Sequence, residues 1–304
     1  RFEVFDAAGG AVTLLPDGLT ARFTPAPGYS GTPSFRFAAT DAGPDSRALL
    51  VYDFEPPDAS SPSDVPDASG QGRDGVLDAV GTGAATRTND VPSAFGRNGR
   101  SLDLAENGGA NAARLSRAIS AAELNFNTSD WTITGWFKRR DSQNEDMVWH
   151  LNFGDGFGSG EELYLMAHSA SNLSLHHYPG PDVNIVASNV TPNVWHHCAV
   201  IRSGTTLSLY LNGAPVGTDA CFALNINPSY PLIFGGHTDT SATYAPRWFD
   251  GALDDLAVYT AALSPSEIAA LAAGISARHL GGLTSTGTVT LGATPCAFVW
   301  TNAL

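Results

Sequence analysis

One stretch restricts the fold of this chain more than any other: residues 195–217, WHHCAVIRSGTTLSLYLNGAPVG. Apolar and polar residues alternate through CAVIR and through TLSLYLN, which is the two-residue period of a β-strand. A Ser-Gly pair separates the two runs, and Asn212-Gly213, a strong signal for a tight hairpin turn, ends the second. The stretch therefore predicts a β-meander with one apolar face and one mixed face that meets water or a ligand.

The alternation also predicts which residues face each other. The first hairpin would place Cys198 opposite Leu209 on the apolar face, and the second would place Val216 opposite Leu209. Cys221 then lies on the other face, about 9 to 10 Å from Cys198, unless a bulge within residues 214–220 reverses the parity.

The same register predicts whether Cys198 can form a disulfide. A disulfide needs Cα atoms within roughly 7 Å, so we expect Cys198 to be a free, buried thiol. Cys221 and Cys296 remain a candidate pair.

Composition narrows the class of protein. The 304 residues are 43% hydrophobic, enough for a large core, and 32 Gly and 19 Pro separate short β-rich runs, which favours an all-β fold. With 16 Lys and Arg against 30 Asp and Glu, and no basic run, we expect no nucleic-acid partner. No apolar run approaches the roughly 18 residues of a membrane span, so we expect no membrane insertion. The chain starts at Arg1, without Met, and we expect a piece of a longer or processed protein.

The first 45 residues predict three strands, at 11–15, 20–24 and 34–40, separated by turn-forming Pro, Asp and Gly residues. A DG turn followed by TPAPGYSGT and SFRFAATDA resembles the end of the cadherin-like or immunoglobulin-like repeats of large bacterial surface proteins. The segment is too short for a complete sandwich of that kind.

A second unit starts near residue 46. Its predicted strands lie at 48–55, 101–104, 131–140, 146–153, 162–168, 173–178, 230–236 and 252–260, in addition to the meander. A short helix is expected at 264–271, with Ser264 as N-cap, Pro265 at its first position and Glu267 three residues after the cap.

Four motifs of this unit occur in an order found in one known family: DASGQGRDGVL, WTITGWFK, the meander, and FDGALDDLAVYTAALSPSEIAAL. Residues 48–274 resemble the laminin-G-like, concanavalin-A-type jelly rolls. The resemblance implies a sandwich of two antiparallel sheets whose first and last strands lie side by side. Members of this family are mostly extracellular modules that bind glycans or proteins, often with a structural calcium ion.

The expected organisation is a partial repeat at 1–45, a jelly roll at 46–274 with a short C-terminal helix, and a tail at 275–304. The tail holds two possible strands, at 286–291 and 297–301. It could begin another repeat, pair with the N-terminal segment, or make an intermolecular contact.

The loop from Asp67 to Gly75 is the candidate calcium site. Calcium takes six to eight oxygens, which carboxylates and the carbonyls of a Gly-rich loop can supply. The resemblance places an acid of the last strand beside this loop, with one at the end of the first strand as a further candidate. The alternative is an ordinary Asx turn. The candidate ligands are Asp67, Ser69, Gly72, Asp254, Asp255 and Glu55.

The sequence argues against catalysis. The glucanases of this fold take their carboxylates from alternate residues of one strand, and E-x-D-x-E does not occur in this chain. Glu161 and Glu162 are adjacent and would point to opposite faces, and neither G-x-S-x-G nor H-E-x-x-H is present.

Histidines and aromatic residues remain as candidates for binding. Adjacent His pairs in a strand point to opposite faces, so packing in the manner of an aromatic ring is favoured over metal binding for the histidines. Those considered are His150, His168, His176, His177, His196, His197 and His237. Sugar rings stack on aromatic faces in or beside Gly, Ser or Pro-rich segments. The candidates for this role are Trp149, Tyr178, Tyr244 and Trp248.

The sequence thus predicts an extracellular or cell-surface, calcium-stabilised, non-catalytic binding module. Its expected partner is a glycan or a cell-surface protein. The alternative is a structural subunit of a surface layer or filament, in which the terminal β segments add strands to copies of the same chain. A glycan-cleaving enzyme is a weaker third interpretation.

Overall fold

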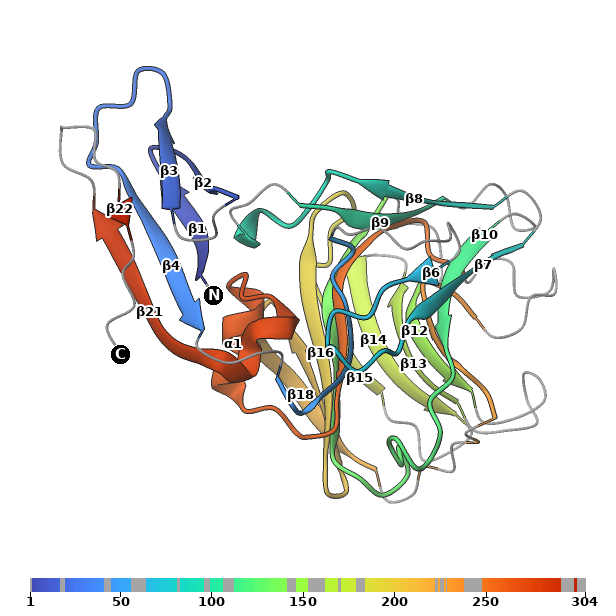
Figure 1. Cartoon of the computed structure of the whole chain (residues 1–304). Helices are drawn as coiled ribbons and strands as arrows, with labels where there is room; N and C mark the ends of the chain where they lie inside the picture. The colour runs from blue at the N-terminus through green and yellow to red at the C-terminus, as the bar shows by residue number, and fades with distance from the viewer. Residues whose placement is uncertain are drawn as a thin grey trace.

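The described part of the chain is mostly β, with several antiparallel sheets and one α-helix. The computed structural model describes residues 2–16, 20–40, 45–55, 64–80, 83–95, 99–105, 112–140, 146–152, 162–168, 171–178, 184–221, 224, 227, 229–237, 248–290 and 298–299. Two units are visible in Figure 1: a small β module that carries both ends of the chain, and a larger sandwich beside it.

The sandwich consists of two antiparallel sheets, as predicted for a jelly roll. Its strands are β5 (Ala48–Tyr52), β6 (Asp64–Val65), β7 (Gly75–Val80), β8 (Ala84–Thr88), β9 (Ser101–Ala105), β10 (Ala112–Arg117), β11 (Trp131–Arg139), β12 (Asp146–Asn152), β13 (Glu162–His168), β14 (Asn172–Tyr178), β15 (Asn184–Ala187), β16 (His196–Ser203), β17 (Thr206–Leu211), β18 (Ala214–Ala220), β19 (Leu232–Phe234) and β20 (Gly251–Tyr259).

We call the sheet with the order β15-β14-β13-β12-β19-β10-β7-β6 the front sheet, and the sheet with the order β18-β17-β16-β11-β20-β9-β8 the back sheet. The first strand of the sandwich, β5, pairs with the last, β20, so the two ends of the sandwich meet as expected.

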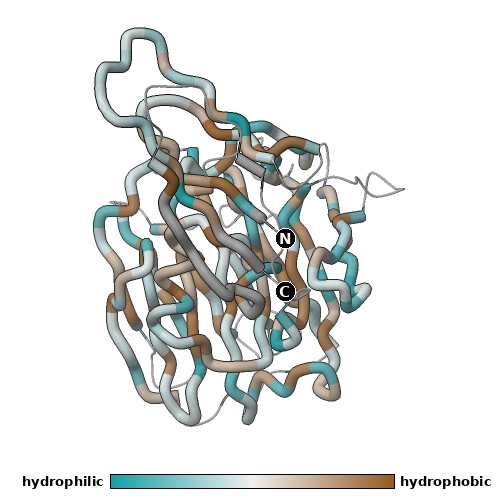
Figure 2. Tube along the Cα trace, turned by 60° about the vertical axis from the view of Figure 1, so that its left-hand side comes forward, coloured by the Kyte–Doolittle hydropathy of each residue, from teal (hydrophilic) through white to brown (hydrophobic). Residues whose placement is uncertain are grey.

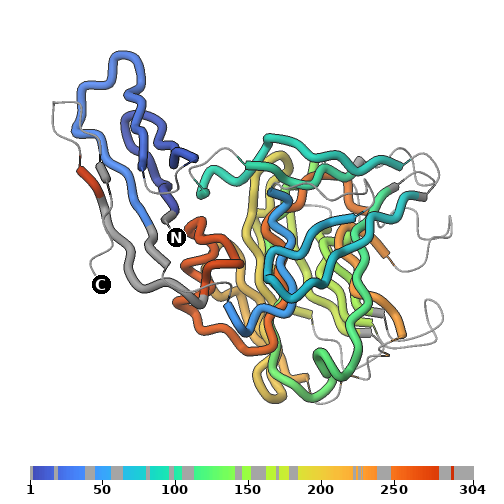
Figure 3. Tube along the Cα trace, viewed as in Figure 1, coloured from blue at the N-terminus to red at the C-terminus, as the bar shows by residue number. Residues whose placement is uncertain are grey.

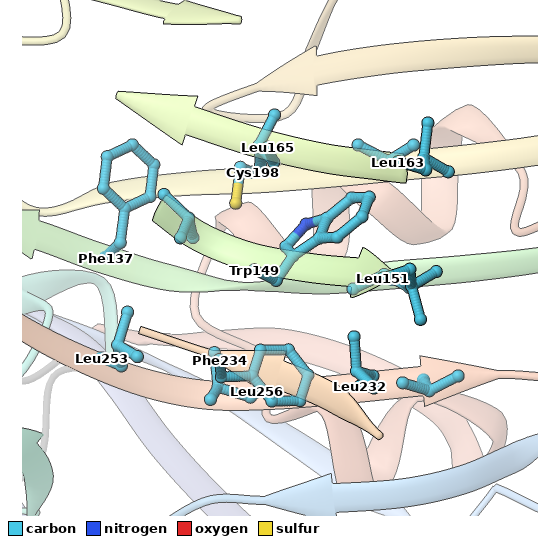
Figure 4. Packing of buried hydrophobic residues seen from close by; sticks show 14 of the residues in the cluster. Phe137, Trp149, Leu151, Leu163, Leu165, Cys198, Leu232, Phe234, Leu253 and Leu256 are labelled. Carbon is cyan, nitrogen blue, oxygen red and sulfur yellow. The ribbon is translucent and has the colours of Figure 1, made fainter. Parts of the chain in front are cut away.

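The main core lies between the two sheets. Alternate residues of each strand enter it, for example Leu163 and Leu165 of β13 and Val200 of β16. Figure 4 shows Trp149 and Phe137 packed there among leucines and beside Cys198. Burial raises the pKa of the Cys198 thiol to about 12, and Cys198 is free, which confirms its predicted state.

The outer face of the back sheet has a second core. Helix α1 (Pro265–Ala272) and the 3-10 helix η4 (Ala277–Gly282) cover it. Ala199 and Ile201 of β16 point into this layer, which explains why every residue of β20 and almost every residue of β16 is buried. Helix α1 begins as predicted: Ser264 is the N-cap and forms a capping box with Glu267.

The meander has the predicted strands in a different register. Cys198 lies opposite Leu211 rather than Leu209, because Gly204 adopts a left-handed φ of 58° and the turn falls one residue later than expected. A shift of two residues keeps every side chain on its predicted face.

The prediction for Cys221 is wrong. Pairing of β17 with β18 skips one residue, so that Tyr210 faces Pro215 while Leu209 faces Gly217. This bulge at Val216 reverses the parity, and Cys221 lies in the main core with Cys198. Cys296, its candidate partner, is outside the described residues.

The small module is built from both ends of the chain. Its strands are β1 (Phe2–Ala8), β2 (Gly10–Leu14), β3 (Thr20–Pro25), β4 (Ser34–Thr40), β21 (Leu283–Thr290) and β22 (Phe298–Val299). They form two three-stranded sheets, β1-β4-β21 and β2-β3-β22. The tail therefore pairs with the N-terminal segment, one of the three predicted possibilities. Figure 3 shows the chain leave the N-terminal strands, pass through the sandwich and return to their side.

The domain limits at residues 45 and 274, and the likeness of the first segment to a cadherin-like or immunoglobulin-like repeat, stay predictions. Phe5, Ile275 and Ala270 form a small apolar contact between the module and the sandwich. Glu3 and His279 add a polar contact of 3.2 Å.

Hydrophobic segments along the chain are short and alternate with hydrophilic ones, as the brown and teal tube of Figure 2 shows. In the described part of the chain, helices long and apolar enough to cross a membrane are absent.

Candidate functional site

The outer face of the front sheet carries polar and aromatic side chains that could bind a ligand. In β13, Leu163 and Leu165 enter the core, so Glu162, Tyr164 and His168 point outward. The neighbouring strand β14 presents His176 on the same side, opposite Tyr164. The site is therefore positioned by the pleat of two paired strands.

A buried cluster occupies one part of this face. His150 of β12, Glu162 of β13 and His237, which follows β19, have exposed fractions of 0%, 1% and 0%. Nε2 of His150 lies 3.6 Å from Oε2 of Glu162, and the two imidazoles stack with their centroids 4.3 Å apart. Each of the three residues offers a ligand atom within 4.8 Å of the others.

Two glycines bring His237 to this cluster. Gly235 adopts a φ of 76°, which a residue with a Cβ rarely does. A Cβ on Gly236 would lie 2.8 Å from the Trp248 ring, so the segment after β19 can approach that ring only with glycine there.

Arg114 lies next to the cluster and contacts both Trp248 and His237. Its guanidinium lies 5.6 Å from the centroid of the Trp248 ring, donates a hydrogen bond to the carbonyl of His237, and lies 3.6 Å from the carboxylate of Asp78. Burial lowers the pKa of Arg114, and Asp78 acts in the opposite direction. The backbone of His237 is thus held by a charged donor.

Three partly exposed rings lie beside the cluster, and we call them the ring patch: Tyr164, His168 and His176. Tyr164 and His176 stack at 5.2 Å, and the Nε2 atoms of His168 and His176 are 3.3 Å apart. His150 connects cluster and patch, since its ring is 6.0 Å from that of Tyr164.

The family of the chain is given by a comparison with known sequence families. The pattern of the concanavalin A-like lectin/glucanases superfamily, in its laminin-G form, matches residues 107–269, which is more than half of the chain. The chain belongs to this superfamily. The comparison with curated protein sequences found no match.

Solved structures with this concanavalin A-like fold include domain 4 of AbnA, a GH43 extracellular arabinanase from Geobacillus stearothermophilus, in complex with arabinotriose. It is 15% identical, with a TM-score of 0.56, and the match covers 76% of this chain and 100% of that domain. The binding domain of botulinum neurotoxin DC, in complex with rat synaptotagmin II, is 12% identical with a TM-score of 0.50, over 74% of this chain and 51% of that one.

A third structure comes from work on botulinum neurotoxin type C, whose cell entry depends on two ganglioside molecules. It is 11% identical with a TM-score of 0.52, again over 74% and 51% of the two chains. At these identities the likeness shows the shared fold alone.

In this concanavalin A-like domain, the loop predicted to bind calcium is closed by its own hydrogen bonds. Oδ1 of Asp67 accepts from the backbone of Val51 and Ser69, and Oδ2 accepts from the Ser69 hydroxyl and the Arg73 backbone, all at 2.8–2.9 Å. All four acceptor positions of the carboxylate are thus engaged. Gly72, with a φ of 70°, allows the loop to turn. This is the Asx-type turn that was the alternative.

The other predicted calcium ligands are also engaged by the protein. Asp255 accepts from Ser276 Oγ at 2.8 Å and from the Ala277 backbone at 2.7 Å, which anchors η4. Asp254 accepts from the backbone of Asp255, and Glu55 from that of Arg100.

Within the described residues, no three of these acids have ligand atoms within 4.8 Å of one another. These acids are engaged by the protein rather than gathered around one point, and calcium binding stays a prediction for measurement.

The aromatic candidates differ from one another in their positions. Trp149 is 1% exposed and lies in the core, because a bulge of β12 between Met147 and Trp149 turns its side chain inward. The prediction of a ligand platform at Trp149 is therefore wrong. The same prediction is wrong for Trp248, which is 2% exposed and packs beside the cluster against Arg114. The side chain of Tyr178 and all of Tyr244 lie outside the described residues.

Sequence reasoning missed the cluster. The cluster combines three separate segments of the chain, which carry His150, Glu162 and His237, so the spacing of these residues gives no signal. The adjacent His pairs indicated packing and not a shared site. Two sequence features were the only indications of this cluster: the alternation of β13, which places Glu162 on the outer face, and the Gly235-Gly236 pair before His237.

Proposed function

We propose that this chain is an extracellular, non-catalytic carbohydrate-binding module, and that it holds its glycan on the outer face of the front sheet. The observation that carries this proposal is the ring patch. Tyr164, His168 and His176 are partly exposed on a sheet surface whose backbone is fixed by continuous pairing of β13 with β14.

The chemistry of the patch suits a sugar. The C–H groups of a pyranose or furanose ring pack on aromatic faces, and imidazole and phenol groups exchange hydrogen bonds with hydroxyls. The rigid strands reduce the entropy lost when the side chains bind. The neighbouring strand adds Asn184, an exposed amide opposite His176.

Relatives of the same fold support a binding role. One was solved with arabinotriose, another with rat synaptotagmin II, and the cell entry of a third toxin depends on two ganglioside molecules. A glycan or a cell-surface protein is therefore the class of partner to test, and the ring patch favours the glycan.

The non-catalytic part of the proposal rests on the carboxylates. A retaining glycosidase needs two carboxyl groups about 5 Å apart. The described cluster on the front sheet contributes one, Glu162.

The test is a glycan array with the full chain, with and without Ca²⁺, that includes arabino-oligosaccharides and gangliosides. For a glycan that is retained, Tyr164→Ala and His176→Ala should each weaken the affinity roughly tenfold, because a lost stacking contact costs about 1 kcal/mol or slightly more. Tyr29→Ala, an aromatic residue 45% exposed on the small module, is the matched control and should bind as the unchanged chain does.

If no glycan is retained, the function is wrong. If a glycan binds and both variants keep full affinity, the binding surface is wrong. Assembly into a layer or filament stays a prediction, and it loses part of its basis because β21 and β22 already pair within the chain.

A further inference from the structure

We propose that His150, Glu162 and His237 form a binding site for a divalent transition-metal ion, with Zn²⁺ as the ion that fits best. The site lies beside the ring patch but shares no residue with it, and it does not depend on the proposed glycan function. It also differs in place and chemistry from the predicted calcium loop.

The distances suit a small metal ion. Zinc bonds of about 2.0–2.1 Å in a tetrahedral arrangement place ligand atoms about 3.4 Å apart. Nε2 of His150 and Oε2 of Glu162 are already 3.6 Å apart, and the atom of His237 lies within 4.8 Å of both. Small side-chain rotations therefore bring all three into coordination distance.

The donor types select the ion. Two imidazole nitrogens and one carboxylate oxygen are a common zinc set that leaves a fourth position for water or another ligand. Calcium and magnesium prefer oxygen ligands, so a site with two imidazoles discriminates against them.

Burial explains why a cation belongs in this place. Glu162 is 1% exposed, and an ionised carboxylate in such surroundings needs positive charge nearby. A protonated His150 alone could pair with it. A simple ion pair, however, gives no reason for a second imidazole stacked on the first, whereas a metal ion uses all three groups.

The surrounding structure holds the ligands in place. His150 and Glu162 stand on strands paired with each other, and the ladder between β12 and β19 fixes the start of the segment that carries His237. Arg114 donates to the His237 carbonyl and so fixes the backbone from which this imidazole extends.

One other pair of imidazoles in the described structure could bind zinc. His168 and His176 have Nε2 atoms 3.3 Å apart, but both are partly exposed, and no third His, Cys, Asp or Glu of the described residues completes a metal-binding group with them. This pair supplies the matched control.

The experiment uses the full chain, stripped with a chelator and titrated with Zn²⁺ by calorimetry, with metal content measured after gel filtration. One zinc per chain is expected. Glu162→Gln and His237→Asn should each weaken binding roughly tenfold or more, and His168→Gln should leave it unchanged. X-ray absorption of the zinc-loaded unchanged chain should show two imidazole ligands, which needs no variant to fold.

A stoichiometry well below one would overturn the proposal. So would a loss of zinc in His168→Gln with retention in Glu162→Gln, because that result places the ion at the exposed pair. Circular dichroism of each variant separates loss of the site from loss of the fold.

Discussion

His197 is a buried residue whose contacts in the sandwich determine its protonation state. Thr134 donates its hydroxyl to the carbonyl of Cys198 at 3.0 Å, so it accepts from Nε2–H of His197 at 2.9 Å. The imidazole packs edge-on to Trp136 at 5.3 Å. Burial lowers the pKa of His197 to about 3, which keeps the ring neutral in the folded state at any moderate pH.

This residue should make the fold sensitive to acid. Above pH 6.5 both states carry neutral His197, but below it only the unfolded chain binds the proton, so stability falls as pH decreases toward 3. The expected loss is about 2 kcal/mol by pH 5, from 1.36 kcal/mol for each pH unit below 6.5.

Urea unfolding at pH 7 and pH 5 measures the effect. The His197→Gln variant should lose less stability over that interval, although it starts from a lower value. Equal losses in both proteins would mean that His197 does not titrate between the two states.

The sequence also indicated that His196 and His197 point to opposite faces and pack as rings, because the two-residue period of a strand is local information. Phe137 packs near His196, and Trp136 near His197. The meeting of His150 with His237 depends on the pairing of β12 with β19, two strands that lie far apart in the sequence, and local patterns contain no record of such a pairing.

The loop between β6 and β7 is the connection whose contribution to stability can be measured most directly. The carboxylate of Asp67 accepts four hydrogen bonds, one of them from Val51 in β5, and so joins the loop to the first strand of the sandwich. We expect Asp67→Ala to cost roughly 3 kcal/mol of the free energy of unfolding, because several partly buried donors lose a charged acceptor.

The role of calcium can be separated from that of the hydrogen bonds. If these bonds alone set the stability, the cost of Asp67→Ala is the same in millimolar Ca²⁺ and in chelator. A calcium site of micromolar affinity would instead add about 4 kcal/mol in Ca²⁺ and lose it in the variant. Asp219→Ala, which removes one local acceptor on β18, serves as control and should change stability by less than about 0.5 kcal/mol.

Most long elements were predictable because their patterns are regular. The meander strands, β11, β20 and helix α1 are indicated by alternation and by the capping residues. Short strands such as β8 and β15 have too few residues for a period to emerge. The bulge at Val216 was recognised only as a possibility, since tertiary packing decides whether a strand skips a residue.

For the whole molecule, the pairing of β4 with β21 makes the small module depend on both ends of the chain. Its core is small and consists of Val4, Val12, Ala21 and Phe35 with partly buried neighbours. A module of this size cannot bury much apolar surface after losing a strand from each of its sheets.

We therefore expect removal of residues 283–304 to unfold the small module and to leave the sandwich folded. Hydrogen exchange should show loss of protection in β1 to β4 and unchanged protection in β16 and β17. Removal of residues 291–304 alone keeps β21 and is the control, in which β4 should stay protected. Loss of protection in the sandwich after the larger truncation would show that the two units fold as one.

The partner of β4 is synthesised about 240 residues after it, which has a consequence for the growing chain. At roughly 5–20 residues per second, the first strands wait on the order of 10 to 50 seconds for β21. During that time the edge of β4 is an open template for any other strand, including one from a neighbouring nascent chain. Closure of the module is therefore a late event in biogenesis, and the interval before it is the period in which a chaperone would protect this protein most.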